Sequence, residues 1–94
     1  MSYSVVKDPD ADLDYGFDWS AWLGTDTIAS STWSVPDGSG LTAHDGAVDA
    51  AGKQTTIWLR GGTPSRAPVP VTNHVVTAGG RADDRSIAVT VAQR

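Results

Sequence analysis

The last part of the chain alternates strictly between side chains that favour burial and side chains that favour solvent. Every second position of residues 86–92 is a β-branched aliphatic residue: Ile87, Val89 and Val91. Residues 71–77 alternate in the same way, and Gly79 and Gly80 separate the two segments. Period-two alternation with β-branched residues is typical of half-buried strands, and glycine supplies the positive φ angles of a short turn. The pattern therefore predicts a β-hairpin.

Residues 13–20 carry the same alternation with larger side chains. The odd-numbered positions of this segment are apolar or aromatic: Leu13, Tyr15, Phe17 and Trp19. This predicts a strand that ends near Ser20, followed by a short helical turn where Trp22 and Leu23 break the period. Fully burying a large apolar side chain stabilises a fold by roughly 1.5–3 kcal/mol. We therefore expect two or three of the four tryptophans to anchor the core.

Three further segments predict strands. Residues 27–35 form one, with a bulge because Ile28 is out of phase with Trp33. Residues 55–60 form another, and its two faces are Thr56, Trp58 and Arg60 on one side and Ile57 and Leu59 on the other. Residues 41–44 give one short strand within a small, polar stretch that extends to residue 51.

Turn signals separate these segments. Residues 36–40 hold Pro, Asp and two Gly, and residues 63–70 hold three prolines, which indicates a loop or a sheet edge. About seven short strands with turns between them predict an all-β fold, an immunoglobulin-like antiparallel β-sandwich. We expect residues 13–94 to form a single sandwich domain. Residues 1–12 form either an N-terminal arm or a first strand, followed by an acidic turn.

Composition narrows the possible functions. The chain has 94 residues, a net charge of −4 and no cysteine. Lys and Arg are few and scattered, which argues against binding to nucleic acid, because phosphate backbones need a clustered basic face. No apolar run approaches the roughly 20 residues of a membrane-spanning helix, and residues 1–7 lack the apolar core of a signal peptide. We expect no nucleic-acid or membrane partner.

No motif for a metal, a cofactor or catalysis is complete. Residues 8–14 place aspartates at every second position, but a calcium loop starting at Asp8 would need Gly and Glu where Leu13 and Trp19 stand. His44 and His74 are thirty residues apart, and neither has a close-spaced zinc ligand or a nucleophile motif beside it. We expect an acidic turn and two surface histidines, and no enzyme.

Five residues are candidates for a protein–protein interface. Tyr3, Val5 and Val6 would contact a neighbour if the N-terminal segment is an extended arm. Trp22 follows the end of the predicted strand, and aromatic residues concentrate at interface anchors. Arg81 lies beside the hairpin turn among compensating charges, where a role in recognition is secondary.

Several short blocks occur in an order found in one group of proteins. They are Lys7-Asp8-Pro9-Asp10; Leu13-Asp14-Tyr15 with Asp18-Trp19; Ile28 through Ser30-Ser31-Thr32-Trp33 to Val35-Pro36; Trp58-Leu59 with Gly61-Gly62-Thr63; and Val71-Thr72-Asn73-His74 through Gly80-Arg81 to Asp83-Asp84-Arg85-Ser86. In their order and spacing the chain resembles small virion proteins of tailed phages described as fiber–tail adaptor proteins. The resemblance covers nearly the whole chain.

This resemblance implies a non-enzymatic immunoglobulin-like domain built into the phage particle in many copies, in a symmetric assembly. The implied partners are other virion proteins, namely tail and fiber components. The implied location is the virion, assembled in the cytoplasm of the bacterial host. An acidic, cysteine-free domain is compatible with that compartment.

Three alternatives stay open at this point. A capsid decoration protein on the phage head, bound to the major capsid protein, would need the same kind of rigid β domain. A carbohydrate- or ligand-binding module would need an exposed tryptophan, with Trp58 or Trp22 as candidates. An enzyme has the least support and would need a pocket that joins His74 to a carboxylate and a hydroxyl group.

Overall fold

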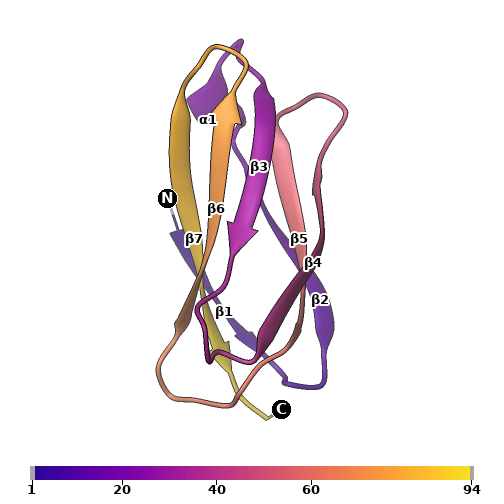
Figure 1. The fold of residues 1–94 in the computed structure, drawn as a ribbon, viewed down its shortest axis with the longest axis vertical. Helices are drawn as coiled ribbons and strands as arrows, with labels where there is room; N and C mark the ends of the chain where they lie inside the picture. The colour runs from indigo at the N-terminus through magenta and orange to yellow at the C-terminus, as the bar shows by residue number, and fades with distance from the viewer. Residues whose placement is uncertain (1, 94) are drawn as a thin grey trace.

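The computed structural model describes residues 2–93, which form seven strands and one short helix. The elements are β1 (Ser2–Lys7), β2 (Asp12–Asp18), α1 (Ser20–Leu23), β3 (Ile28–Ser34), β4 (Leu41–Val48), β5 (Gln54–Gly61), β6 (Val69–Thr77) and β7 (Ala82–Val91). The strands form a four-stranded sheet in the order β1-β7-β6-β3 and a three-stranded sheet in the order β2-β5-β4. The two sheets pack face to face (Figure 1). The prediction of an all-β sandwich of about seven short strands is confirmed.

One strand pair departs from the expected antiparallel arrangement. β1 pairs with β7 in parallel, whereas all other pairs among residues 2–93 are antiparallel. Parallel neighbours need a long connection, and here the connection from β1 to β7 contains the rest of the domain. The seven strands of an immunoglobulin constant domain are lettered A to G in chain order, and they form the sheets ABED and CFG. The same letters can be given to β1–β7 of this chain. This chain keeps the orders BED and CFG but moves its first strand to the edge beside β7.

The core lies between the sheets, and the period-two patterns position it. The inward residues of β6 and β7 are almost inaccessible to solvent: Val71, Asn73, Val75, Ile87, Val89 and Val91. β2 contributes Phe17, and Trp19 directly after it is fully buried. Trp22 and Trp33 pack against this core from its margins. Three of the four tryptophans therefore anchor the core, as the sequence predicts.

A hydrogen-bonded cluster of side chains connects the two sheets inside this core. The Asn73 Oδ1 atom on β6 accepts hydrogen bonds from Thr55 Oγ1 (2.7 Å) on β5 and Trp19 Nε1 (3.2 Å). The Asn73 Nδ2 group donates to Ser31 Oγ (2.8 Å) and to the Thr32 carbonyl (3.0 Å), both on β3. All the donors and acceptors of the Asn73 amide are thus paired. In this cysteine-free chain, the bonds from Thr55 and Trp19 to Asn73 join the two sheets across the core.

β4 is longer than the short strand expected at residues 41–44. It runs to Val48 and pairs with β5 throughout, but its register shifts between His44 and Ala47. Asp45, inside this bulge, has a φ of 53°. A bulge breaks the alternation on which a sequence-based prediction depends, and this explains why the second half of the strand was missed.

β6 begins inside the proline-rich stretch that the sequence assigns to a loop or an edge. Pro70 pairs with Ala88 of β7. On its other side, β3 ends at Ser34, opposite Thr72, so Pro70 has a single neighbouring strand. A proline cannot donate to a ladder and is tolerated where one side of the strand is free.

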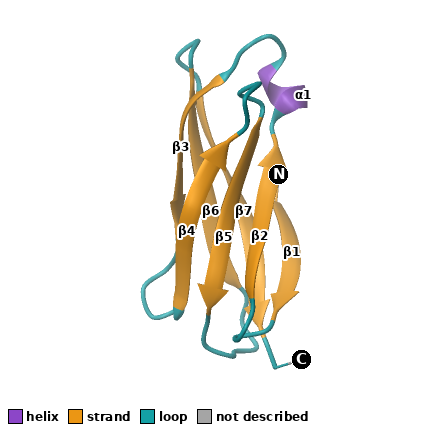
Figure 2. Ribbon diagram, turned by 90° about the vertical axis from the view of Figure 1, so that its right-hand side faces the viewer, coloured by secondary structure: helices purple, strands orange, loops and turns teal. Residues whose placement is uncertain are grey.

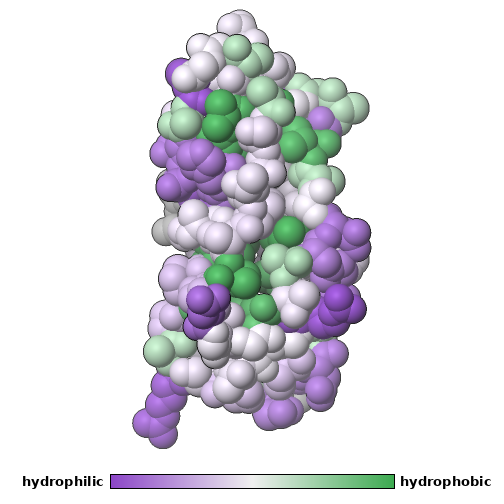
Figure 3. All heavy atoms as spheres, in the orientation of Figure 1, coloured by the Kyte–Doolittle hydropathy of each residue, from purple (hydrophilic) through white to green (hydrophobic). Residues whose placement is uncertain are grey.

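The sandwich is a rod of about 41 × 21 × 20 Å whose two seams are closed differently. On one seam, Tyr3 of β1 bonds to the backbone of Gly16 of β2. On the other, β3 and β4 contact each other. Figure 2 shows the three-stranded sheet in front, with α1 at one end of the rod. In Figure 3, hydrophilic atoms lie on both sides of the rod, and they cover the lower part of the right-hand side, where Figure 1 places that sheet.

Candidate functional site

The five predicted interface residues lie in two separate places. Tyr3, Val5 and Val6 belong to β1 at the edge of the four-stranded sheet. Trp22 lies on α1, and Arg81 lies in the β6–β7 turn at the same end of the rod. The structure therefore brings Trp22 and Arg81 together but does not place them in one site with the β1 residues.

Two of the three β1 residues hold the edge strand onto the sandwich. The Tyr3 hydroxyl donates to the Gly16 carbonyl (2.9 Å) and accepts from the Gly16 N–H (3.2 Å), and its ring meets Phe17 edge to face at 5.3 Å. Burial raises the pKa of Tyr3, although the bond to Gly16 opposes this shift. Val5 packs against the core. Val6 is 50% exposed and offers apolar surface to a neighbour.

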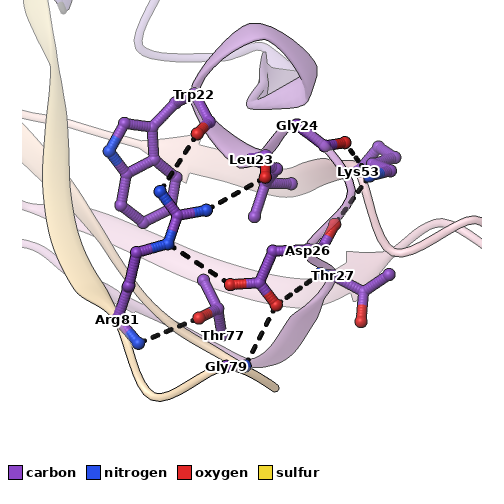
Figure 4. A network of polar contacts seen from close by, with 9 residues as sticks. All are labelled: Trp22, Leu23, Gly24, Asp26, Thr27, Lys53, Thr77, Gly79 and Arg81. Carbon is purple, nitrogen blue, oxygen red and sulfur yellow. Dashed lines mark hydrogen bonds and ion pairs between the residues drawn. The ribbon is translucent and has the colours of Figure 1, made fainter.

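Arg81 and Trp22 contact each other directly (Figure 4). The Arg81 guanidinium lies over the Trp22 ring, 4.4 Å from its centroid. It donates to the carbonyls of Trp22 (3.2 Å) and Leu23 (3.0 Å) and, through Nε, to the Asp26 carboxylate (3.3 Å). The β6–β7 turn is thereby bound to α1 and to the loop that follows it.

Asp26 is the acceptor at the centre of this cluster. Contacts with the Thr77 hydroxyl, the Thr27 and Gly79 amides and Arg81 hold the pKa of Asp26 down to about 2, against partial burial that opposes the shift. A side chain at Gly79 would collide with the Asp26 carboxylate, at 2.8 Å. From the β4–β5 turn, Lys53 Nζ donates to the Gly24 carbonyl (2.8 Å) and the Asp26 carbonyl (2.6 Å). Three connections are therefore held together at one end of the rod, and a rigid end of this kind suits contact with another protein.

Lys7 was not singled out by the sequence, although it continues the inward positions of Tyr3 and Val5. Its side chain is buried, and Nζ donates to the carbonyls of Gly61 (2.7 Å) and Asp8 (2.9 Å). Burial lowers the pKa of Lys7, while nearby aspartates, Asp12 foremost, oppose the shift. The lysine stabilises the end of β1 against β5 and is not available to a ligand.

The two histidines lie on opposite outer faces and contact carboxylates. His74 Nδ1 lies 2.5 Å from Asp84 on the four-stranded sheet. His44 lies between Asp12 (Nε2, 2.8 Å) and Asp45 (Nδ1, 2.7 Å) on the three-stranded sheet. These two carboxylates raise the pKa of His44. Within residues 2–93, the hydrogen bonds of both rings go to carboxylates and not to a hydroxyl group.

The outer face of the three-stranded sheet carries an exposed tryptophan that the sequence named for ligand binding. Trp58 of β5 is 39% exposed. The strand register places Asp14 of β2 directly opposite it on one side and His44 of β4 on the other. Side chains at directly opposite positions share a face and interact. Sequence alternation places Trp58 on one face of its strand with Thr56 and Arg60, but the neighbours of Trp58 depend on the pairing of β2, β5 and β4.

A groove of about 440 Å³ lies between the β3–β4 and β5–β6 connections at the end of the rod opposite α1. Its lining includes four prolines and one charged residue, Asp37. The lining contains no histidine and no charged residue other than Asp37. It therefore lacks the pair of titratable groups that acid–base catalysis uses.

Among residues 2–93, no group of three or more His, Cys, Asp or Glu side chains is arranged to hold a metal ion. No helix there is long and apolar enough to cross a membrane. The acidic segment before β2 instead forms a turn in which the Asp8 carboxylate accepts from the Asp10 N–H (2.8 Å).

Comparison with known families identifies the chain. A family model described as podophage GP4 fiber-tail adaptor protein gp77 matches residues 7–90, which include β2 to β6 and nearly all of β7. No curated protein matches the sequence. The family match spans nearly the whole domain and confirms the resemblance carried by the sequence blocks. The chain belongs to the podophage GP4 fiber-tail adaptor protein gp77 family.

Proposed function

We propose that this chain is a non-enzymatic structural protein of a podophage virion that links a fiber to the tail through protein–protein contacts. The observation that carries the proposal is the family match over residues 7–90. The partners in this proposal are tail and fiber proteins of the same particle. The protein is assembled into the particle in the host cytoplasm, in several copies that follow the symmetry of the tail.

The geometry supports a linking role in two respects. The domain is elongated, at 41 × 21 × 20 Å, and its α1 end is held rigid by the contacts of Arg81, Asp26 and Lys53. A rigid domain loses little conformational freedom when it binds, which leaves more of the contact energy for affinity. Its two sheets also present different outer faces, so that two partners can bind at once.

The contacts of β1 give this proposal a defined surface. Tyr3 and Val5 hold β1 in place, while Val6 extends outward from the edge of the four-stranded sheet. Exposed apolar side chains at a sheet edge can pack against a partner protein. Val6, on the edge strand β1, belongs to one contact in the proposed assembly, and Trp22 and Arg81 at the α1 end belong to a second.

Cryo-electron microscopy of the particle that carries this gene tests the proposal. We expect density for this domain where fibers meet the tail, in contact with both components. Density spread over the head surface would contradict the proposal and indicate a decoration protein. Absence of the chain from purified particles, measured by mass spectrometry, would contradict any role in the virion.

A further inference from the structure

Two tryptophans of the domain are covered by an arginine of the same chain. The Arg81 guanidinium lies 4.4 Å from the Trp22 ring centroid, and the Asp26 carboxylate accepts from its Nε. The Arg85 guanidinium lies 4.0 Å from the centroid of the buried Trp19. In each case a guanidinium stacks on an indole, where the negative face of the ring attracts the cation.

Trp58 has an indole ring and a neighbouring carboxylate, as Trp22 does, but no cation of the described chain lies over its ring. Asp14 lies directly opposite it on β2, and both side chains are exposed on the outer face. Within residues 2–93, no arginine or lysine lies over the Trp58 ring, and Asp14 forms no side-chain hydrogen bond or ion pair. Arg60, the next residue on that face of β5, is opposite Asp12 instead. Trp33 does not offer a comparable site, because its ring stacks on Phe17 at 5.9 Å.

His44, on the other side of Trp58, does not complete the arrangement. Its ring stacks beside the indole at 6.3 Å, and both its nitrogens already contact the carboxylates of Asp12 and Asp45. The strands of this face carry four aspartates, namely Asp12, Asp14, Asp18 and Asp45. The cations near these aspartates lie beside members of the group other than Asp14: His44 beside Asp12 and Asp45, and Arg85 near Asp18. Lys7 and Arg60 both lie near Asp12.

We infer that Trp58 and Asp14 form an open half-site for an arginine side chain from a partner protein. The guanidinium stacks on the exposed indole face and pairs with the Asp14 carboxylate, and this carboxylate favours a cationic side chain over a neutral one. Arginine is preferred over lysine because its planar group both stacks and pairs. That the partner is a fiber or tail protein rests on the proposed function.

A titration followed by NMR tests the half-site in solution. The probe is the peptide acetyl-Gly-Arg-Gly-amide, with the corresponding Lys and Gln peptides and free galactose as comparisons. We expect the Trp58 indole N–H signal to shift with the Arg peptide, less with Lys, and not with Gln or galactose. The D14N variant, which keeps the indole signal, should bind the Arg peptide about threefold to tenfold more weakly. D37N removes one exposed aspartate elsewhere and should bind as the wild type does.

Two outcomes of the titration would overturn the inference. One is an equal response of D14N and wild type to the Arg peptide. The other is a Trp58 response to galactose but not to arginine, which would indicate a carbohydrate site.

The same variants in the phage particle separate the half-site from the proposed function. We expect particles carrying D14N or W58L to lose fibers or this chain, and particles carrying D37N to be complete. Thermal melts of the purified variants show that each is folded. If the wild-type chain is in the tail and both variants assemble completely, the half-site is wrong and the proposed function stands. If the wild-type chain is absent from the particle, the proposed function fails, while the NMR result still decides the half-site.

Discussion

The buried cluster around Asn73 and the surface cluster around Asp26 and Arg81 join distant parts of the chain by similar hydrogen bonds. The first is centred on the fully buried side chains of Trp19, Thr55 and Asn73 and links the two sheets. The second lies at the α1 end, where the Arg81 side chain is 45% exposed, and links three connections (Figure 4). The two clusters differ mainly in what happens when a hydrogen bond is lost. A fully buried group is left without a partner, whereas an exposed group can bond to water.

Because of this difference, the two clusters contribute differently to the stability of the fold. A hydrogen bond contributes about 1 kcal/mol net, but a buried group left without its partner costs about 1–3 kcal/mol. The Asn73 cluster therefore determines which sheets pack together and in which register. An exposed ion pair is worth about 0–1 kcal/mol, so the Arg81 cluster orders the loops at one end with little effect on global stability.

The largest effect is expected from Asn73→Leu. It leaves Ser31 Oγ and the Thr32 carbonyl without their donor and removes the acceptor of Thr55. We expect the free energy of unfolding to fall by roughly 2–4 kcal/mol, measured by urea denaturation. Gln54→Leu makes a similar change at an exposed site and should cost under about 0.5 kcal/mol. Similar losses for both variants would remove the distinction between core and surface.

Thr55→Val is expected to have the next largest effect. It keeps the shape of the side chain but removes the hydroxyl that donates to Asn73 and accepts from Trp19. The expected loss in the free energy of unfolding is about 1–2 kcal/mol, with Thr56→Val on the exposed face as the control. A double-mutant cycle of Thr55 and Asn73 should show coupling, and additive losses would mean that the two residues act separately.

Asp26→Asn should change how stability depends on pH in the acid range. The pKa of Asp26 is about 2 in the folded chain and lies below its ordinary value of 3.8. Between these values the unfolded chain binds more protons, so the stabilisation from Asp26 is present above about pH 4 and is lost as the pH falls toward 2. Melting temperatures of the variant should therefore fall less steeply over this range than those of the wild type. An unchanged slope would contradict the role of Asp26.

The smallest effect is expected from Arg81→Gln. It removes the guanidinium over Trp22 and the bond to Asp26, but water reaches the groups left behind. We expect a loss of under about 1 kcal/mol in the free energy of unfolding, and a smaller loss at high salt. Arg66→Gln, in the exposed β5–β6 loop, is the matched control. A loss as large as that of Asn73→Leu would show that the α1 end is part of the folding core.

The sequence predicted the parts of the fold that follow from alternation. The apolar face predicted for β7 lies inward, and β6 and β5 keep the two separate faces that alternation predicts, because each strand repeats its period without interruption. The second half of β4 was missed at its bulge, and the parallel pairing of β1 involves a strand more than eighty residues away. Neither the bulge in β4 nor the parallel pairing of β1 is marked by a pattern in the neighbouring residues of the sequence.

The candidate sites were less predictable because they depend on contacts between distant segments. Trp22 and Arg81 were named separately for partner binding, yet the structure stacks one on the other. Alternation groups Asn73 with Val71 and Val75, but its partners come from β3, β5 and the residue after β2. The pairing of Trp58 with Asp14 follows only from the register of β2 and β5. Whether Tyr3, Val5, Val6, Trp22 and Arg81 contact a partner stays a prediction.

The parallel pairing of β1 with β7 has a mechanical consequence. The two strands run in the same direction, and six residue pairs join them, from Ser2↔Ser86 to Lys7↔Val91 (Figure 1). A pull on the start of β1 and the end of β7 in opposite directions acts along the strands, so the ladder is sheared and its hydrogen bonds share the force. Antiparallel terminal strands pulled at adjacent ends would instead peel apart one bond at a time. A domain placed under tension through its two chain ends therefore resists force along its long axis.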